Sequence, residues 1–242
     1  HKGGKISVKA RMAIDSISVI RKIYTPGVAK VCKLIQAKPE LAYDYTAIGN
    51  TVAIVTNGTA ILGLGDIGAV PGMPVMEGKA ALFDALVGIS GVPILIQSKD
   101  VEEIIRTVAS IAPTFGAIKL EDIKAPECFE IEDRLCGMLD IPVMHDDQHG
   151  TAVVVLAALL NASKYVGMQV KNDTVGMVGL GAAGMGISKL LMAYGVRKML
   201  GADINPMAKE IFAKAGGKPV TLPEIMEQSD IVICTTGVPG LI

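Results

Sequence analysis

The chain has 242 residues, of which 50% are hydrophobic and 19% charged, a composition that supports large buried cores and excludes an intrinsically disordered protein. Its length fits about two domains better than one small core. Because 23 basic residues nearly balance 24 acidic ones, no global charge points to nucleic acid or to an anionic membrane, and we expect a small-molecule partner.

The cysteines and the hydropathy pattern indicate the compartment. Cys32, Cys128, Cys136 and Cys234 show neither C-x-x-C spacing nor the density of a secreted disulfide scaffold, so we expect buried, reduced thiols. No apolar run approaches the roughly 20 residues of a membrane helix, and the first residues do not resemble a signal peptide. We therefore predict a cytoplasmic protein. Because the chain opens at His1 and not at Met, we expect further residues upstream.

In the first half, apolar runs alternate with segments of helical periodicity. Two β-rich runs, 50–55 and 60–68, flank the turn T-N-G-T and predict a hairpin. Further on, the pattern predicts a helix over 76–89, a strand over 92–97, a helix over 101–115, a strand over 116–120, a helix over 126–139, a strand over 141–147 that runs into a polar turn, and a helix over 151–167. This alternation predicts a parallel α/β domain over residues 1–150.

The second half repeats the alternation more regularly. The pattern predicts a strand over 173–181, a helix over 182–196, a strand over 197–203, a helix over 206–216 and a strand over 230–237. Residues 151–242 therefore read as an incomplete Rossmann-type, doubly wound dinucleotide-binding domain. The fold class that we predict is a two-domain α/β protein.

The spacing G-x-G-x-x-G occurs twice, at residues 63–68 and 179–184. The second copy follows a strand and opens a helix, so its backbone N–H groups can face a pyrophosphate. The first is followed by A-V-P-G-M-P, whose two prolines should prevent a helix from starting there. We assign only the second copy to a dinucleotide, with Gly179, Leu180, Gly181, Ala182, Ala183 and Gly184 as its cofactor-binding residues.

Asp203 ends the strand that follows this turn, about 20 residues on, where a carboxylate accepts hydrogen bonds from the adenosine ribose. Its charge would repel a ribose phosphate, so it favours NAD over NADP. Arg197 and Lys198 lie at the other end of the strand and should not rescue phosphate binding. The alternative is that Asp203 only caps the helix that begins near Pro206.

Two acidic pairs follow neighbouring predicted strands, Glu121 with Asp122 and Asp146 with Asp147. The carboxyl ends of parallel strands converge on one crevice, where several carboxylates repel one another unless a hard divalent cation neutralises them. Oxygen-only ligands suit Mg or Mn better than Zn. The alternative is that these charges only cap helices.

Two other features near these pairs are ambiguous. His145 and His149 are four apart, as in some zinc sites, but the glutamine and glycine beside them favour a turn over a helix. Lys79 lies near the start of a predicted helix, where a cation does not complement the helix dipole. It is either a solvated lysine or a functional one.

Five motifs together carry a resemblance: Y-T-P-G-V-A at 24–29, the segments 63–83, 120–132 and 145–152, and V-G-L-G-A-A-G at 178–184. In this order they resemble the malic enzyme family, in particular its short prokaryotic branch. The resemblance implies oxidative decarboxylation of malate to pyruvate and CO2, with reduction of NAD, or of NADP, and with Mn or Mg. It also implies a homodimer or a higher homo-oligomer.

The resemblance assigns roles to five residues. Tyr24 falls on the family's acid and Lys79 on its general base, while Glu121, Asp122 and Asp147 fall on its metal carboxylates. A lysine kept neutral by nearby positive charge and partial desolvation can take the proton of the malate hydroxyl. The metal polarises the ketone for loss of CO2, and the tyrosine protonates the enol carbon.

The chain departs from the family in two places. Ala60 stands where larger animal members carry an arginine that grips the substrate, and the chain stops after about four Rossmann strands, whereas the family continues. In this picture Asp66 and the first glycine loop shape the substrate side of the crevice. Two alternatives stay open: malolactic decarboxylation of malate to lactate, and a non-catalytic metal and nucleotide sensor, against which the presence of Tyr24 and Lys79 argues.

Overall fold

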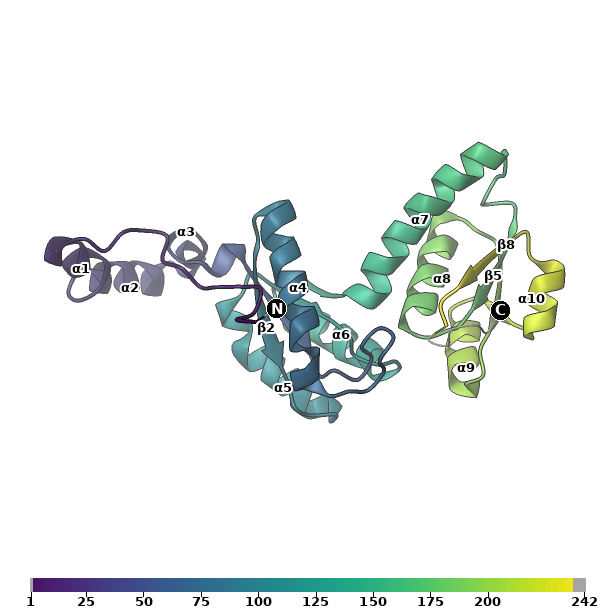
Figure 1. The fold of residues 1–242 in the computed structure, drawn as a ribbon, viewed down its shortest axis with the longest axis horizontal. Coiled ribbons are helices and arrows are strands. Elements are labelled where there is room, and N and C mark those ends of the chain that lie inside the picture. Colours follow the sequence, from purple (N-terminus) through teal and green to yellow (C-terminus); the bar gives the residue numbers. More distant parts are fainter. Residues whose placement is uncertain (1, 237–242) are drawn as a thin grey trace.

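The computed structural model describes residues 2–236, which contain two four-stranded sheets, both entirely parallel. The first sheet has the order β2-β1-β3-β4 and the second has the order β7-β6-β5-β8. The long helix α7 (Asp146–Val166) leads from the last strand of the first sheet toward the second (Figure 1). The predicted α/β architecture with parallel sheets is confirmed.

The first sheet is built from short apolar strands that pack against helices. Its strands are β1 (Thr51–Thr56), β2 (Ser90–Leu95), β3 (Ala117–Leu120) and β4 (Val143–His145), and its helices are α4 (Ala69–Val87), α5 (Val101–Ile111) and α6 (Glu127–Met138). Val55 and Leu120 of the sheet form one buried cluster with Ile104 and Leu135 of the helices. Burial of each such side chain contributes about 1.5–3 kcal/mol, which fixes the ends of β3 and β4 beside each other.

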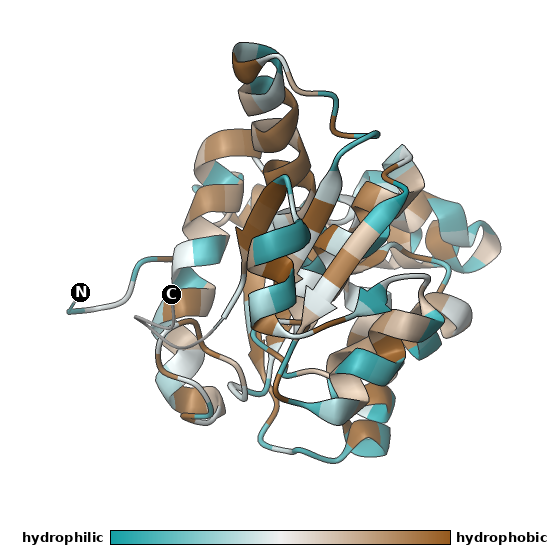
Figure 2. Cartoon of the chain, turned by 90° about the vertical axis from the view of Figure 1, so that its right-hand side faces the viewer, coloured by the Kyte–Doolittle hydropathy of each residue, from teal (hydrophilic) through white to brown (hydrophobic). Residues whose placement is uncertain are grey.

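The second sheet has the strand–turn–helix order of a Rossmann half. Its strands are β5 (Thr174–Val178), β6 (Lys198–Ala202), β7 (Lys218–Pro219) and β8 (Ile231–Cys234), and its helices are α8 (Ala182–Tyr194), α9 (Pro206–Lys214) and α10 (Leu222–Gln228). Figure 2 shows hydrophobic ribbon along the central strands and hydrophilic ribbon on outer helical turns. Met177, Leu191 and Phe212 are completely buried in this core. The sequence pattern did not predict β7 or α10.

An N-terminal arm, residues 2–45, precedes the first sheet. It carries α1 (Ile17–Ile23), α2 (Val28–Ala37), a 3-10 turn (Pro39–Leu41) and α3 (Ala42–Tyr45), and a second 3-10 turn (Ile48–Asn50) joins it to β1. None of its three α-helices contains a buried residue. Its first residues lie against α4, where Lys5 Nζ donates to the Pro74 carbonyl at 2.8 Å, and its helices extend away from the sheet (Figure 1). The sequence pattern predicted no helix or strand here. The expected burial of the cysteines is wrong for Cys32 on this arm and for Cys136 and Cys234, which are exposed, and correct for Cys128.

The predicted hairpin at T-N-G-T is wrong. After β1 the chain forms a loop with a single bridge, between Ile61 and Gly65, while β1 pairs in parallel with β2 and β3. The glycines of the loop explain the difference, because Gly58, Gly63 and Gly65 all have positive φ and turn the chain out of the extended conformation.

A helix does start directly after the first glycine motif, contrary to our expectation. Helix α4 begins at Ala69 and includes both Pro71 and Pro74. Pro71 lies in the first turn, where backbone N–H groups have no partner within the helix, so its missing donor costs little. Only Pro74 removes an interior hydrogen bond, and the 19-residue helix accommodates it.

Helix α7 also starts earlier than predicted, at Asp146, so Gln148, His149 and Gly150 are helical and do not form a turn. The two aspartates in its first turn favour this start because they complement the positive end of the helix dipole. The proposed domain boundary at residue 150 consequently falls inside α7.

Helix α7 is 21 residues long and apolar enough, by length and composition alone, to cross a membrane. The expectation that no apolar segment approaches the length of a membrane helix is therefore wrong for α7. A single helix of this kind is only a weak indication of a membrane span, and α7 packs along α8 (Figure 1).

Candidate active site

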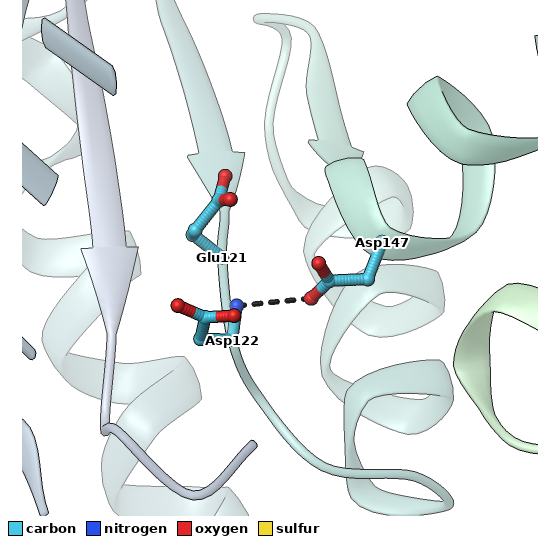
Figure 3. Close-up of side chains that lie close together, drawn as sticks. All are labelled: Glu121, Asp122 and Asp147. Carbon is cyan, nitrogen blue, oxygen red and sulfur yellow. Dashed lines mark hydrogen bonds between the residues drawn. The ribbon is translucent and has the colours of Figure 1, made fainter. Parts of the chain in front are cut away.

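Three carboxylates meet where the first sheet ends. Glu121 and Asp122 directly follow β3, and Asp147 lies in the first turn of α7, directly after β4. Their ligand oxygens all lie within 4.8 Å of one another (Figure 3). The register explains this meeting, because Leu120 of β3 is opposite His145 of β4, so the two acidic segments leave the sheet side by side.

Asp122 is held by its backbone, and its buried carboxyl is incompletely neutralised. Its N–H donates to Asp147 Oδ2 at 3.0 Å, and its φ of 52° is left-handed. Among the described residues, no group donates to the buried Asp122 Oδ2. Burial, reinforced by the charge of Asp147, raises the pKa of the Asp122 carboxyl to about 6. A hard divalent cation fits this oxygen-only set, since it would compensate the charges that crowd here.

Two lysines share one carboxylate beside this cluster. Lys79 Nζ of α4 donates to Asp146 Oδ2 at 2.8 Å and lies 3.2 Å from Glu121 Oε1. Lys119 Nζ of β3 lies 3.0 Å from the same Asp146 oxygen and also pairs with Glu121. Lys79 is therefore partly buried and not a solvated lysine. Its direct contacts are carboxylates, and Lys119 on the same Asp146 oxygen supplies the nearby positive charge that we expected.

Lys119 was missed by the sequence reasoning. It is a charged residue in the apolar strand β3 and its side chain is 5% exposed, so burial lowers its pKa to about 8. Burial alone would raise the pKa of Asp146, but the hydrogen bond from Lys79 and the charge of Lys119 outweigh burial and lower it. The sequence did contain a signal for Lys119, because a lysine in an apolar run that predicts a buried strand needs a charged partner.

Tyr24 is not brought to this cluster. It is the C-cap of α1 on the N-terminal arm and is 69% exposed, and within residues 2–236 no interaction joins it to Lys79 or to the carboxylates. The first glycine loop does approach the cluster, because Ala60 N–H donates to the Asp122 carbonyl at 3.0 Å. Asp66 of that loop pairs with Lys99 Nζ at 2.6 Å.

Apart from the carboxylate cluster, a cavity of about 590 Å³ opens at the C-terminal end of β5. Strand β5 lies between β6 and β8, so this is the switch point at which Rossmann folds bind dinucleotides. Gly179, Gly181 and Asp203 line the cavity. Gly184 packs so closely that a Cβ would overlap the Gly179 carbonyl, which is the role of a third glycine in this motif.

The remaining predicted cofactor residues surround this cavity without lining it. Leu180 is buried, and Ala182, Ala183 and Gly184 form the first turn of α8. Their backbone places the positive end of α8 at the glycine turn, where it attracts a pyrophosphate.

Asp203 holds the glycine turn. Its Oδ2 accepts from Leu180 N–H at 2.6 Å and its Oδ1 from Asn205 N–H at 2.8 Å. The cap of α9 is Asn205, whose side chain accepts from Met207 N–H, so the alternative that Asp203 only caps this helix is wrong. Lys209 of α9 also lines the cavity and was not anticipated.

Comparisons with known proteins agree with this layout. A family model described as malic enzyme, N-terminal domain, matches residues 4–100 and 97–136. A second model, described as the NAD binding domain of D-isomer specific 2-hydroxyacid dehydrogenase, matches residues 144–239. The two glycine motifs therefore fall in separate matches, and the second falls in an NAD-binding domain.

Individual relatives give the same result. The chain is 59% identical to NAD-dependent malic enzyme 1 of Bacillus subtilis, over 100% of this chain and 55% of that protein. It is 42% identical to the bifunctional malic/malolactic enzyme of the same species, over 95% of this chain and 60% of that protein. The crystal structure of NAD-dependent malic enzyme from Thermotoga maritima superimposes with a TM-score of 0.90 at 40% identity, over 96% of this chain and 66% of that chain. The chain thus spans little more than half the length of these curated relatives, and it belongs to the malic enzyme family.

Proposed function

We propose that this chain is part of an enzyme that oxidatively decarboxylates malate to pyruvate and CO2, with reduction of NAD(P) and dependence on Mn or Mg. The observation that carries the proposal is the meeting of Glu121, Asp122 and Asp147 within 4.8 Å, with Lys79 Nζ 3.2 Å from Glu121. A base can take the hydroxyl proton as hydride leaves a 2-hydroxy acid, and a cation on such oxygens can polarise the resulting ketone for loss of CO2, so the arrangement suits both halves of this reaction.

The residues of the cluster divide the chemistry between them. Glu121, Asp122 and Asp147 would hold the cation, which when bound supplies positive charge that withdraws electrons from the substrate oxygens, while the nicotinamide accepts hydride. Lys79, in its uncharged form, would take the proton of the malate hydroxyl at Nζ. Asp146 orients this Nζ through its 2.8 Å hydrogen bond.

The position of Tyr24 supports a homodimer. The residue is exposed on an arm whose helices bury nothing, and Ile17 and Ile20 of the same helix are exposed as well. Apolar residues on an extended arm are commonly covered by a second copy of the chain. We propose that Tyr24 of one copy serves the site of the other, where its hydroxyl would protonate the enol carbon to give pyruvate.

NAD is the cofactor that we propose, because the Asp203 carboxylate lines the cavity and would repel a ribose phosphate. Lys209, on the same cavity, is the side chain that would allow some use of NADP. The balance of carboxylate and ammonium in this cavity sets the preference. For the compartment we propose the cytoplasm.

A second candidate is malolactic conversion of malate to lactate, which is favoured by the similarity to the bifunctional malic/malolactic enzyme. Incubation of the full-length protein with malate, NAD and Mn²⁺ distinguishes the candidates. The proposed reaction accumulates NADH and pyruvate, the malolactic reaction yields lactate without net NADH, and a non-catalytic sensor yields neither.

A further inference from the structure

The first turn of α7 carries Asp147 of the carboxylate cluster and Asp146, the partner of the two lysines, yet no side chain of its own caps it. Asp146 and Asp147 open the helix, and the residue before them, His145, makes no side-chain capping hydrogen bond. The first N–H groups of a helix lack partners within the helix, so an uncapped start frays unless another element holds it. Something outside α7 must fix these two aspartates.

Glu132 of α6 supplies that contact. Its Oε1 accepts from His145 N–H at 2.7 Å, and its Oε2 accepts from the Gln148 side-chain amide at 2.9 Å. His149 Nε2 lies 2.9 Å from Oε1. The Glu132 side chain is only 12% exposed, so these hydrogen bonds to a charged group are largely shielded from water.

The other side of the same turn rests on α8. Gly186 approaches the backbone of Gln148 so closely that a Cβ on it would overlap the Gln148 carbonyl. Gln148 is itself 3% exposed. The turn is therefore held between α6, which belongs to the first sheet, and α8, which belongs to the second.

We propose that Glu132 is a positioning residue that fixes the first turn of α7, and through it Asp147, against Asp122. The 3.0 Å hydrogen bond from Asp122 N–H to Asp147 Oδ2 exists only while the turn stays in place. The consequence for metal binding rests on the proposed function. The consequence for the Asp122 hydrogen bond does not, because it is a property of the chain alone.

The test compares three variants of the full-length protein: Glu132→Ala, Glu132→Gln and Asp133→Ala. Asp133 is the exposed neighbour of Glu132 on α6, so its loss removes the same charge and none of the contacts to α7. Glutamine keeps an oxygen that can accept from His145 N–H. Amide hydrogen exchange is followed at His145 and at Asp122, and Mn²⁺ affinity is measured by calorimetry.

We expect exchange at both amides to accelerate about 10- to 100-fold in Glu132→Ala, the effect of losing a hydrogen bond to a charged group. Mn²⁺ affinity should fall about 10-fold, as for other partners that orient a ligand. Glu132→Gln should recover most of the protection, and Asp133→Ala should match the unsubstituted protein throughout.

Unchanged exchange at Asp122 in Glu132→Ala would overturn the proposal, even if exchange at His145 rises, because Asp147 would then keep its place without Glu132. Equal effects of Asp133→Ala would also overturn it. If the unsubstituted protein binds no Mn²⁺, the metal site in the proposed function fails, while exchange at Asp122 still decides the role of Glu132.

Discussion

At the scale of single residues, the site is organised by opposite charges that share atoms. Asp146 Oδ2 receives both Lys79 and Lys119, and Glu121 pairs with both lysines as well. Within the described residues Asp122 forms an ion pair with neither lysine, and burial, reinforced by the charge of Asp147, raises its pKa to about 6 although both lysines act to lower it. Glu121 and Asp146 thus hold Lys79 in place, whereas the Asp122 carboxyl is the one that, in the proposed function, is left for a cation.

Lys79→Ala should lower turnover of malate by about 10²- to 10⁴-fold and leave NAD affinity nearly unchanged, because the base acts on the substrate proton and not on the dinucleotide. Steady-state rates and calorimetry with NAD are the measurements. Lys214→Ala, which removes an exposed lysine of α9 paired with Glu210, is the control and should behave like the unsubstituted protein. A variant that keeps more than half of its turnover would show that Lys79 is not the base.

Asp122→Asn should stabilise the metal-free protein at neutral pH. The folded-state pKa of Asp122, about 6, lies above its ordinary value of 3.8, so the stability linked to this group is fully present below pH 3.8 and is lost as the pH rises through 6. The difference at pH 7 is of order 2–3 kcal/mol. Asparagine tolerates the left-handed backbone here, so the exchange adds no strain.

Urea unfolding at pH 4 and pH 7 with chelator tests this expectation. The variant should gain stability over the unsubstituted protein only at pH 7 and should bind Mn²⁺ more weakly at the same pH. An equal difference in stability at both pH values would contradict the assignment of a buried, unneutralised carboxylate to Asp122.

Asp203→Asn should lower the preference for NAD over NADP by about 10- to 100-fold, since it removes the charge and keeps an oxygen that can hold Leu180 N–H. Lys209→Ala is the companion variant and should act in the opposite direction. The readout is the ratio of kcat/KM for the two cofactors. A ratio that is the same in Asp203→Asn and the unsubstituted protein would remove Asp203 from the ribose site.

At the scale of elements, the sequence predicted what depends on local pattern. The alternation of strands and helices from β2 to β8, apart from β7 and α10, follows from apolar runs and helical periodicity. The two acidic pairs follow adjacent strands, and a parallel sheet brings such strand ends together. The motif resemblance marked Lys79 and the three carboxylates, which the structure brings together.

The errors arose where a distant contact decides the local structure. Helix α7 starts at Asp146, where Glu132 of α6 accepts from the N–H of the preceding residue, and no local pattern reveals this contact. The early start of α4 was missed because Pro71 was read as a helix breaker, although the first turn tolerates proline. Lys119 was missed because its role depends on Asp146, which is distant in sequence.

The glycine turn between β5 and α8 gives an element-scale prediction. Gly184→Ala should destabilise the protein by about 1–3 kcal/mol, because its Cβ would overlap the Gly179 carbonyl and push α8 away from β5. Gly181→Ala is the matched variant: its Cβ would meet no atom within 4 Å, so stability should hold. NAD affinity should fall in both, since Gly181 lines the cavity.

Thermal unfolding without cofactor and calorimetry with NAD separate the two effects. Equal unfolding temperatures for Gly184→Ala and Gly181→Ala would contradict the packing role of Gly184.

At the scale of the whole molecule, the proposed reaction depends on both sheets and, in the proposed dimer, on two chains. The carboxylate cluster lies at the end of the first sheet, the cavity lined by Gly179 and Gly181 at the end of the second, and α7 leads from one sheet to the other (Figure 1). Tyr24 lies on the arm beyond the first sheet. The proposed reaction needs all three regions at one substrate.

Mixing two inactive variants tests this arrangement. If Tyr24 serves the partner's site, Tyr24→Phe and Lys79→Ala should complement each other when unfolded and refolded together, because each mixed dimer contains one complete site. A random mixture should recover roughly a quarter of the normal activity. Separately refolded variants mixed afterwards are the control and should stay inactive. No recovery in mixed dimers verified by mass spectrometry would place Tyr24 in its own chain's site or outside the reaction.

The most direct test of the central claim is a product balance for the full-length protein with malate, NAD and Mn²⁺, with chelator as the control. We expect NADH and pyruvate to form in equal amounts, their formation to stop when chelator is added, and added Mn²⁺ to restore it. Lactate without net NADH, or formation of NADH and pyruvate that continues in chelator, would contradict it.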